Sequence, residues 1–105
     1  MNQNGMNRAQ VIQTLEQHLS ELQTRFGVQE LALFGSVARD GAAQGSDVDL
    51  VADYGEPPTF RQYTGALLYL EDVLGCKVDL VTRSGLKPDL KPMIEQDLVP
   101  IQNAA

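Results

Sequence analysis

Leu-Ala-Leu-Phe-Gly-Ser-Val-Ala-Arg-Asp-Gly at residues 31–41 and Ser-Asp-Val-Asp-Leu-Val at residues 46–51 are the two segments that decide the fold. The apolar start of the first segment predicts a short strand, and Gly35-Ser36 predicts a tight turn at the end of that strand. The second segment has the composition of the next strand. The sequence therefore predicts two short strands that are linked through a glycine-serine turn.

Two aspartates of the second segment are expected on one face of the sheet. Because side chains alternate along a strand, Asp47 and Asp49 would project to one side, about 7 Å apart. Like charges about 5 Å apart repel by roughly 3 kcal/mol at an effective dielectric constant of about 20, so a bound cation would remove a substantial cost. Mg²⁺ suits the pair, because it takes one or two carboxylates and also binds phosphate oxygens, which makes a nucleoside triphosphate the natural ligand. An Asp-x-Asp pair can also be an ordinary pair of strand-edge acids, but the turn before it and a third acid after it favour function.

The third acid is Asp79, in the segment Lys-Val-Asp-Leu-Val-Thr at residues 77–82, which again has strand composition. If this strand lies beside the strand of Asp47, then Asp79 faces the same side and completes a cluster of three carboxylates that could hold two divalent ions. Without that pairing, Asp79 would be an ordinary exposed strand acid.

The turn between the first two strands has the features of a phosphate site. Gly35 permits backbone angles that other residues avoid and allows a phosphate to approach the main chain. Amide groups at the turn, or at the start of a short helix near residues 37–38, would form a small anion-binding concavity with Ser36. Gly-Ser is also a common loop dipeptide, and Arg39 could be a surface charge paired with Asp40.

Taken together, these motifs resemble the DNA polymerase β-like nucleotidyltransferase superfamily. The resemblance is carried by Phe-Gly-Ser-Val-Ala-Arg-Asp-Gly, by Ser-Asp-Val-Asp-Leu and by the later Val-Asp-Leu-Val, and it covers residues 30–82. The short length resembles the minimal nucleotidyltransferases, which act as antitoxins to HEPN-type RNase toxins. The resemblance implies a nucleotidyltransferase fold and enzymatic activity.

The resemblance also implies roles for particular residues. Ser36 and the amides around Gly35 would bind the β- and γ-phosphates of ATP, and Arg39 would lie near them. This chain has Arg39-Asp40-Gly where the family commonly has Arg-Gly, which places an extra negative charge near the phosphates.

For the acids, the resemblance implies that Asp47 and Asp49 bridge two Mg²⁺ ions and that Asp79 binds the catalytic ion. An acceptor hydroxyl would attack the α-phosphate, pyrophosphate would leave, and Asp79 would help to deprotonate the acceptor.

The remaining elements follow from hydrophobic spacing and helix boundaries. Helices are expected at residues 7–25, from residue 59 to the stop at Gly75, and at residues 87–97, with a last strand at residues 98–101. The order of elements predicts an α+β fold: a small mixed sheet backed by helices on one face, with the acids on the other. The loop at residues 41–45 could move over the nucleotide.

Four residues outside these motifs have simple interpretations. Leu68 and Tyr69 widen the apolar stripe of the second long helix and belong either to the core or to a partner surface. His18, the only histidine, is expected to be a solvated or interface residue rather than a metal ligand or general base. Cys76, the only cysteine, is expected to fill space beside a turn.

Composition limits the remaining classes of function. The 105 residues predict a single domain, 1–105, with frayed ends at residues 1–6 and 102–105. The net charge of −6 opposes direct binding to a nucleic acid, which needs Lys and Arg to displace counterions. The sequence has no apolar run long enough to span a membrane, and its polar start does not resemble a signal peptide, so we expect a cytoplasmic protein.

The expected function is a Mg²⁺-dependent transfer of AMP from ATP to a tyrosine or other hydroxyl of a cognate HEPN toxin, which neutralises the toxin. One alternative is a non-catalytic antitoxin or binding module that acts by contact. A second is a nucleotidyltransferase that modifies a small molecule.

Overall fold

The computed structural model describes residues 7–40 and 47–103, and its centre is a four-stranded mixed sheet. The strands lie in the order β3-β2-β1-β4. Strand β1 pairs antiparallel with both β2 and β4, whereas β2 and β3 are parallel. The expected adjacency of the two acid-bearing strands is therefore confirmed. The strands are β1 (Glu30–Phe34), β2 (Val48–Asp53), β3 (Val78–Thr82) and β4 (Val99–Ile101).

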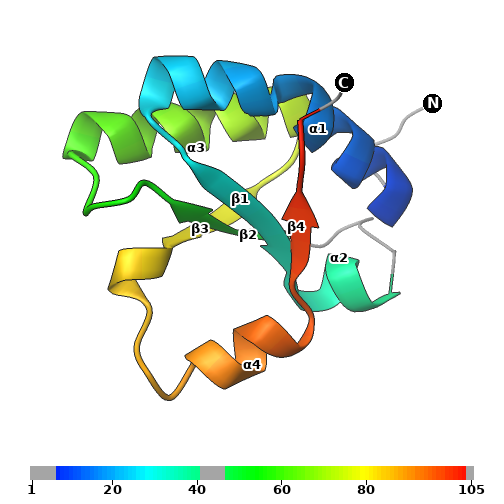
Figure 1. Ribbon diagram of the computed structural model, residues 1–105. Coiled ribbons are helices and arrows are strands. Elements are labelled where there is room, and N and C mark those ends of the chain that lie inside the picture. The colour runs from blue at the N-terminus through cyan, green and yellow to red at the C-terminus, as the bar shows by residue number, and fades with distance from the viewer. Residues whose placement is uncertain (1–6, 41–46, 104–105) are drawn as a thin grey trace.

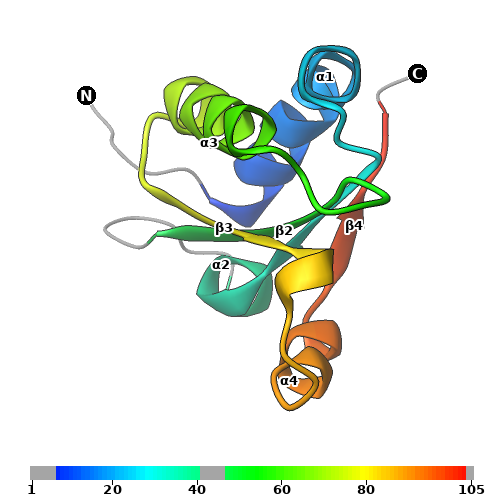
Figure 2. The same ribbon diagram turned by 90° about the vertical axis from the view of Figure 1, so that its left-hand side faces the viewer.

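Two long helices, α1 (Arg8–Phe26) and α3 (Phe60–Leu74), cover one face of this sheet (Figure 1). Helix α3 forms the crossover that the parallel pair β2–β3 requires. The short helices α2 (Gly35–Asp40) and α4 (Lys91–Gln96) lie on the other side of the sheet in Figure 2. The expected α+β sheet backed by helices is confirmed. Helix α4, which was also expected, and α2, at the turn where a short helix was considered, lie opposite the long helices.

Both long helices begin and end with strong local signals. Each has a capping box at its start, formed by Asn7 with Gln10 in α1 and by Thr59 with Gln62 in α3. Helix α3 ends at Gly75, whose backbone is left-handed with φ of 70°. Only glycine adopts this conformation without strain, which explains why the sequence located the end of α3 correctly.

The core lies between the two long helices and the sheet. Alternation along the strands sends one set of side chains into this core and leaves the other set on the opposite side, which we call the second face. The second face carries Asp49 and Val51 on β2 and Asp79 on β3. The core residues include Val11, Leu15, Leu19 and Leu22 of α1, Ala66, Leu70 and Leu74 of α3, and Leu31, Leu33, Val48, Leu50, Val78 and Leu80 of the sheet.

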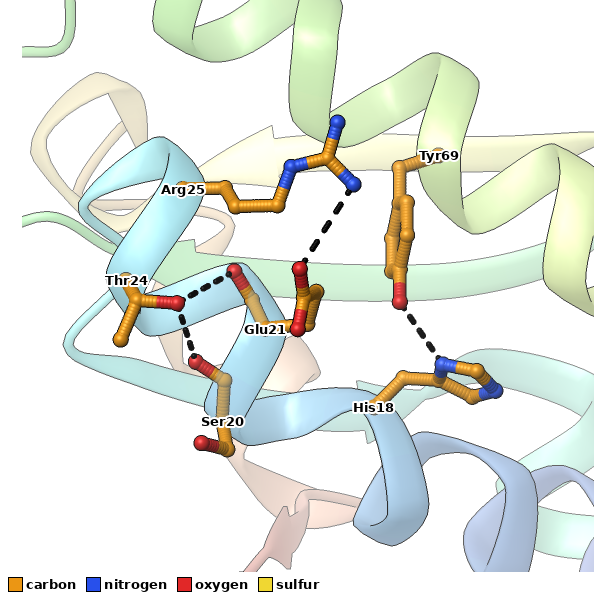
Figure 3. Close-up of polar contacts among 6 residues, drawn as sticks. All are labelled: His18, Ser20, Glu21, Thr24, Arg25 and Tyr69. Carbon is orange, nitrogen blue, oxygen red and sulfur yellow. Dashed lines mark hydrogen bonds and ion pairs between the residues drawn. The ribbon is translucent and has the colours of Figure 1, made fainter.

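A polar contact joins the two long helices at their exposed edge (Figure 3). The Nδ1 atom of His18 lies 2.7 Å from the hydroxyl of Tyr69, and the guanidinium of Arg25 lies 5.5 Å from the centre of the Tyr69 ring. Tyr69 also packs against the core, whereas Leu68 is 59% exposed. The two residues that the sequence left open therefore have different environments, and His18 is an interhelical contact.

Helix α4 begins later than expected. The prediction started this helix at residue 87, but residues 88–90 form a turn and the helix starts at Lys91. Proline at position 88 disfavours helical geometry in the residue before it, and Leu90 makes no side-chain cap. The expected loop at residues 41–45 lies outside the described residues.

Among the described helices, none is long and apolar enough to span a bilayer.

Candidate active site

The second face of the sheet brings the predicted acids together at one end. Asp49 and Asp79 are paired in the register of the parallel strands β2 and β3. The carboxyl groups of Asp79 and of Asp47, which directly precedes β2, are both close enough to act on that of Asp49 electrostatically. The three aspartates selected from the sequence therefore form one electrostatic cluster.

Burial and like charge both affect Asp49. Burial raises the pKa of the Asp49 carboxyl above its ordinary value, and the negative charges of Asp79 and Asp47 raise it further. The positive charge of Arg39 acts in the opposite direction and lowers it. A half-buried carboxylate beside two others is unfavourable without a cation, so the site favours binding of positive charge.

Gly35 lies directly against this cluster. A Cβ atom at this position would lie 2.1 Å from Oδ2 of Asp49, which is far closer than atoms can approach. The backbone at Gly35 has φ of +79°, in the region that side chains disfavour. Glycine is therefore required here for two reasons, and the predicted turn and the predicted acids form one continuous surface.

The other two phosphate-side candidates lie on α2. Ser36 follows Gly35 in the first turn of this helix, at the same end of the sheet as Asp49. Arg39, in the last turn, forms an ion pair with Asp97, with 3.0 Å between Nη1 and Oδ2. The sequence suggested Asp40 as the possible partner of Arg39. The structure describes a pair with Asp97 instead, and the side chain of Asp40 is not described.

Asp97 is thus a residue that sequence reasoning missed. It lies just after α4 and is separated from Arg39 by 58 positions in the chain. No local pattern could have indicated this contact, because it depends on how α4 returns beneath the sheet to α2.

The carboxylates of Asp47, Asp49 and Asp79 suit Mg²⁺ although they do not enclose a metal ion. Within residues 7–40 and 47–103, no three His, Cys, Asp or Glu side chains surround a single point closely enough to enclose a metal ion. Mg²⁺ does not need such a cage, since it binds through one or two carboxylates and completes its octahedron with water and phosphate oxygens. The contact between Asp49 and Asp79, with Asp47 beside it, matches this requirement.

Neither the imidazole of His18 nor the thiol of Cys76 has a chemical role in this cluster. His18 is engaged with Tyr69 between the long helices. Cys76 is half-buried, and burial followed by the charges of Asp47 and Glu71 raises the pKa of its thiol. A raised thiol pKa disfavours the reactive thiolate, in agreement with the expected role of Cys76 as a packing residue.

Comparison with known proteins also points to a nucleotidyltransferase. Residues 15–101 match the family described as nucleotidyltransferase domain. Protein adenylyltransferase MntA of Thermococcus cleftensis is 40% identical over 85 residues, which cover 81% of this chain and 86% of that protein.

Solved structures agree in fold. A structure assigned as a minimal nucleotidyltransferase has 34% sequence identity and a TM-score of 0.68, covering 89% of this chain and 90% of its own. One chain in the structure of the tri-AMPylated Shewanella oneidensis HEPN toxin with MNT antitoxin has a TM-score of 0.64 at 15% identity. It covers 92% of this chain and 73% of its own, and at this identity the likeness shows the fold alone. The chain therefore belongs to the nucleotidyltransferase domain family, and its resemblance to the minimal nucleotidyltransferases is confirmed.

Proposed function

We propose that this protein transfers AMP from ATP to a hydroxyl group, preferably of tyrosine, on a cognate HEPN-type toxin and thereby acts as its antitoxin. The observation that carries the proposal is the cluster of Asp49, Asp79 and Asp47 packed against the turn at Gly35. Within the family, such a cluster is suited to nucleotide chemistry because phosphate oxygens and carboxylates share the same divalent ions.

Each residue then has a defined task. Asp47 and Asp49 would hold two Mg²⁺ ions, and Asp79 would hold the one nearer the acceptor. When bound, the ions neutralise negative charge on the phosphates and on the attacking oxygen. Ser36 and the amides near Gly35 position the β- and γ-phosphates.

The reaction is a displacement at the α-phosphorus. The acceptor oxygen forms a new bond to this phosphorus while the bond to the bridging oxygen of the β-phosphate breaks, and pyrophosphate leaves. The proton of the acceptor hydroxyl passes to Asp79 and then to solvent. The side chains contribute chiefly by positioning the groups and stabilising charge, because phosphoryl chemistry requires little covalent help from the protein.

The relatives support both the donor and the acceptor. MntA is named as a protein adenylyltransferase, and the toxin in the Shewanella complex carries AMP groups. The same assignment implies a cytoplasmic location, where ATP and Mg²⁺ are available.

The test is to incubate the protein with Mg²⁺, each nucleoside triphosphate and the co-purifying partner, and then to measure the intact mass of the partner. Wild type should add the mass of AMP with ATP, and Asp49→Asn should add none. If both proteins silence the partner and neither changes its mass, the contact-only alternative is correct. Transfer to a small molecule and not to the partner would instead favour the second alternative.

A further inference from the structure

A hollow of about 380 Å³ lies on the second face of the sheet, at the opposite end from the acids. Its lining includes Ala32 of β1, Val51 and Asp53 of β2, and Leu98 and Pro100 at β4. This volume lies within the range of small-molecule sites, which are mostly apolar with a few polar groups.

The hollow is aligned with the carboxylate cluster. Val51 follows Asp49 by two residues on the same face of β2, which places it about 7 Å further along the strand. Asp53 follows by four residues, about 13 Å from Asp49 along the strand. A ligand with one end at Asp49 could therefore extend over β2 and reach the hollow without turning around an edge of the sheet.

The lining suits a flat, weakly polar ring system. Ala32 and Val51 are 5% and 2% exposed and form an apolar floor, and Leu98 and Pro100 provide further apolar lining. Polar groups at the border, such as the carboxylate of Asp53, could bind the exocyclic groups of such a ring.

Charged residues of the protein indicate which end of a nucleotide would lie at which end of β2. Glu30 and Asp53 both line the hollow, and Arg83, the one basic residue among its described lining residues, lies 3.8 Å from a carboxylate oxygen of Glu95. This end therefore disfavours phosphates but accepts an uncharged ring. The other end has the Gly35 turn and the charge of Arg39 acting on Asp49.

We infer that this hollow holds the purine base and ribose of the nucleoside triphosphate, with the phosphates extending along β2 to the carboxylate cluster. This inference rests on the proposed function and deepens it, because it assigns the residues that contact the base. Helix α4 is part of the arrangement, since the ion pairs Arg39–Asp97 and Arg83–Glu95 both attach its C-terminal end to the rest of the fold.

The sequence allows a sharp test, because it contains no tryptophan. Gln102 lines the hollow and is exposed, so Gln102→Trp places a fluorophore at its border. Gln17→Trp is the matched control, since Gln17 is also exposed but lies on α1, on the other face of the sheet. Both variants would be titrated in Mg²⁺ with ATP and, separately, with inorganic tripolyphosphate, which has the phosphates but no base.

ATP should shift and quench the emission of Gln102→Trp, tripolyphosphate should not, and Gln17→Trp should respond to neither. A second variant, Ala32→Phe, fills the floor of the hollow and should weaken ATP binding about tenfold or more by calorimetry while leaving tripolyphosphate binding unchanged. Melting curves would verify that each variant is folded, and the fluorescence test does not depend on Ala32→Phe.

The outcomes separate this inference from the proposed function. If wild type binds ATP but Gln102→Trp is silent and Ala32→Phe binds normally, the base lies elsewhere and the proposed function stands. If Gln102→Trp responds to the partner protein and not to ATP, the hollow belongs to the acceptor and the inference is overturned. If wild type binds neither ATP nor tripolyphosphate, the nucleotide site itself is wrong, and both proposals fail.

Discussion

Asp49 of β2 and Asp79 of β3 occupy paired positions in the parallel part of the sheet, and burial, followed by the negative charge of Asp79, raises the pKa of the Asp49 carboxyl. Strand pairing alone would place any two residues side by side. Here it places two acids on the face that lacks the long helices, beside a glycine that cannot accept a side chain. Burial and the neighbouring charges raise the pKa of Asp49, so we expect the arrangement to lower the stability of the free protein and to attract cations.

The first prediction concerns the stability cost of holding the Asp49 carboxylate beside two other acids. In EDTA, Asp49→Asn should leave the free energy of unfolding unchanged or raise it by up to about 1 kcal/mol, because repulsion is removed but solvent screens a half-buried group. Urea unfolding measures the difference, and Asp89→Asn, at an exposed turn position, is the control with an expected change within about 0.5 kcal/mol. With Mg²⁺ and ATP added, wild type should gain more stability than Asp49→Asn. A large loss of stability of Asp49→Asn in EDTA would mean that the carboxylate has a structural role.

A second prediction compares two glycines with similar backbones. Gly35 and Gly75 have φ of +79° and +70°, but a Cβ atom at Gly75 would meet nothing within 4 Å. Gly75→Ala should therefore cost only backbone strain, about 1–2 kcal/mol, and retain full transfer activity. Gly35→Ala must also displace the Asp49 carboxylate and should lose transfer at least about a hundredfold, which is about 2.7 kcal/mol. Equal activity of the two variants would show that the contact between Gly35 and Asp49 is irrelevant to the reaction.

The third prediction is a dependence of stability on pH. Burial, together with the nearby Tyr63, raises the pKa of Tyr54 to about 12, whereas the unfolded chain should have a value of about 10. The folded state then holds this proton more tightly, so the contribution of Tyr54 to stability is complete below pH 10 and is lost as the pH rises from about 10 to about 12.

Urea unfolding between pH 9 and pH 12 tests this, with Tyr54→Phe as the comparison that removes the titrating group. The Tyr54 hydroxyl has no hydrogen-bond partner among the described residues, so at pH 7 the variant should be within about 1 kcal/mol of wild type or more stable. The interpretation fails if both proteins lose stability equally above pH 10.

A fourth prediction assigns His18 and Tyr69 to stability alone. Tyr69→Phe removes the hydroxyl that contacts His18 across the two long helices and should cost about 1 kcal/mol. The rate of AMP transfer per folded molecule should not change. A selective loss of transfer with unchanged stability would give this pair a functional role that the geometry does not indicate.

Local signals in the sequence were sufficient for most of the framework. Asn7, Thr59 and Gly75 mark helix boundaries through side-chain capping or backbone freedom, and each of these effects acts within a few residues. The alternation of apolar and acidic residues around Asp49 and Asp79 distinguished core residues from candidate site residues, because successive side chains of a strand point to opposite faces of the sheet. The sequence did not establish that β2 and β3 are adjacent. The structure shows that the two strands are paired in parallel.

Features that depend on distant contacts could not be predicted. The pairing of Arg39 with Asp97 and the hollow between β1, β2 and β4 both arise from the path of the chain after β3. The start of α4 was wrong because proline at position 88 and the absence of a cap at Leu90 outweighed the apolar spacing of the segment. The roles of Ser36 and Arg39 in phosphate binding, and those of the three aspartates in metal binding, remain predictions.

The most direct test of AMP transfer follows the α-phosphate itself. The protein, Mg²⁺ and the purified partner would be incubated with ATP radiolabelled at either the α- or the γ-phosphate, using wild type and Asp79→Asn. The account predicts label on the partner from α-labelled ATP alone, release of γ-label as pyrophosphate, and neither with Asp79→Asn. Label on the partner from γ-labelled ATP, or transfer that persists fully in Asp79→Asn, would contradict it.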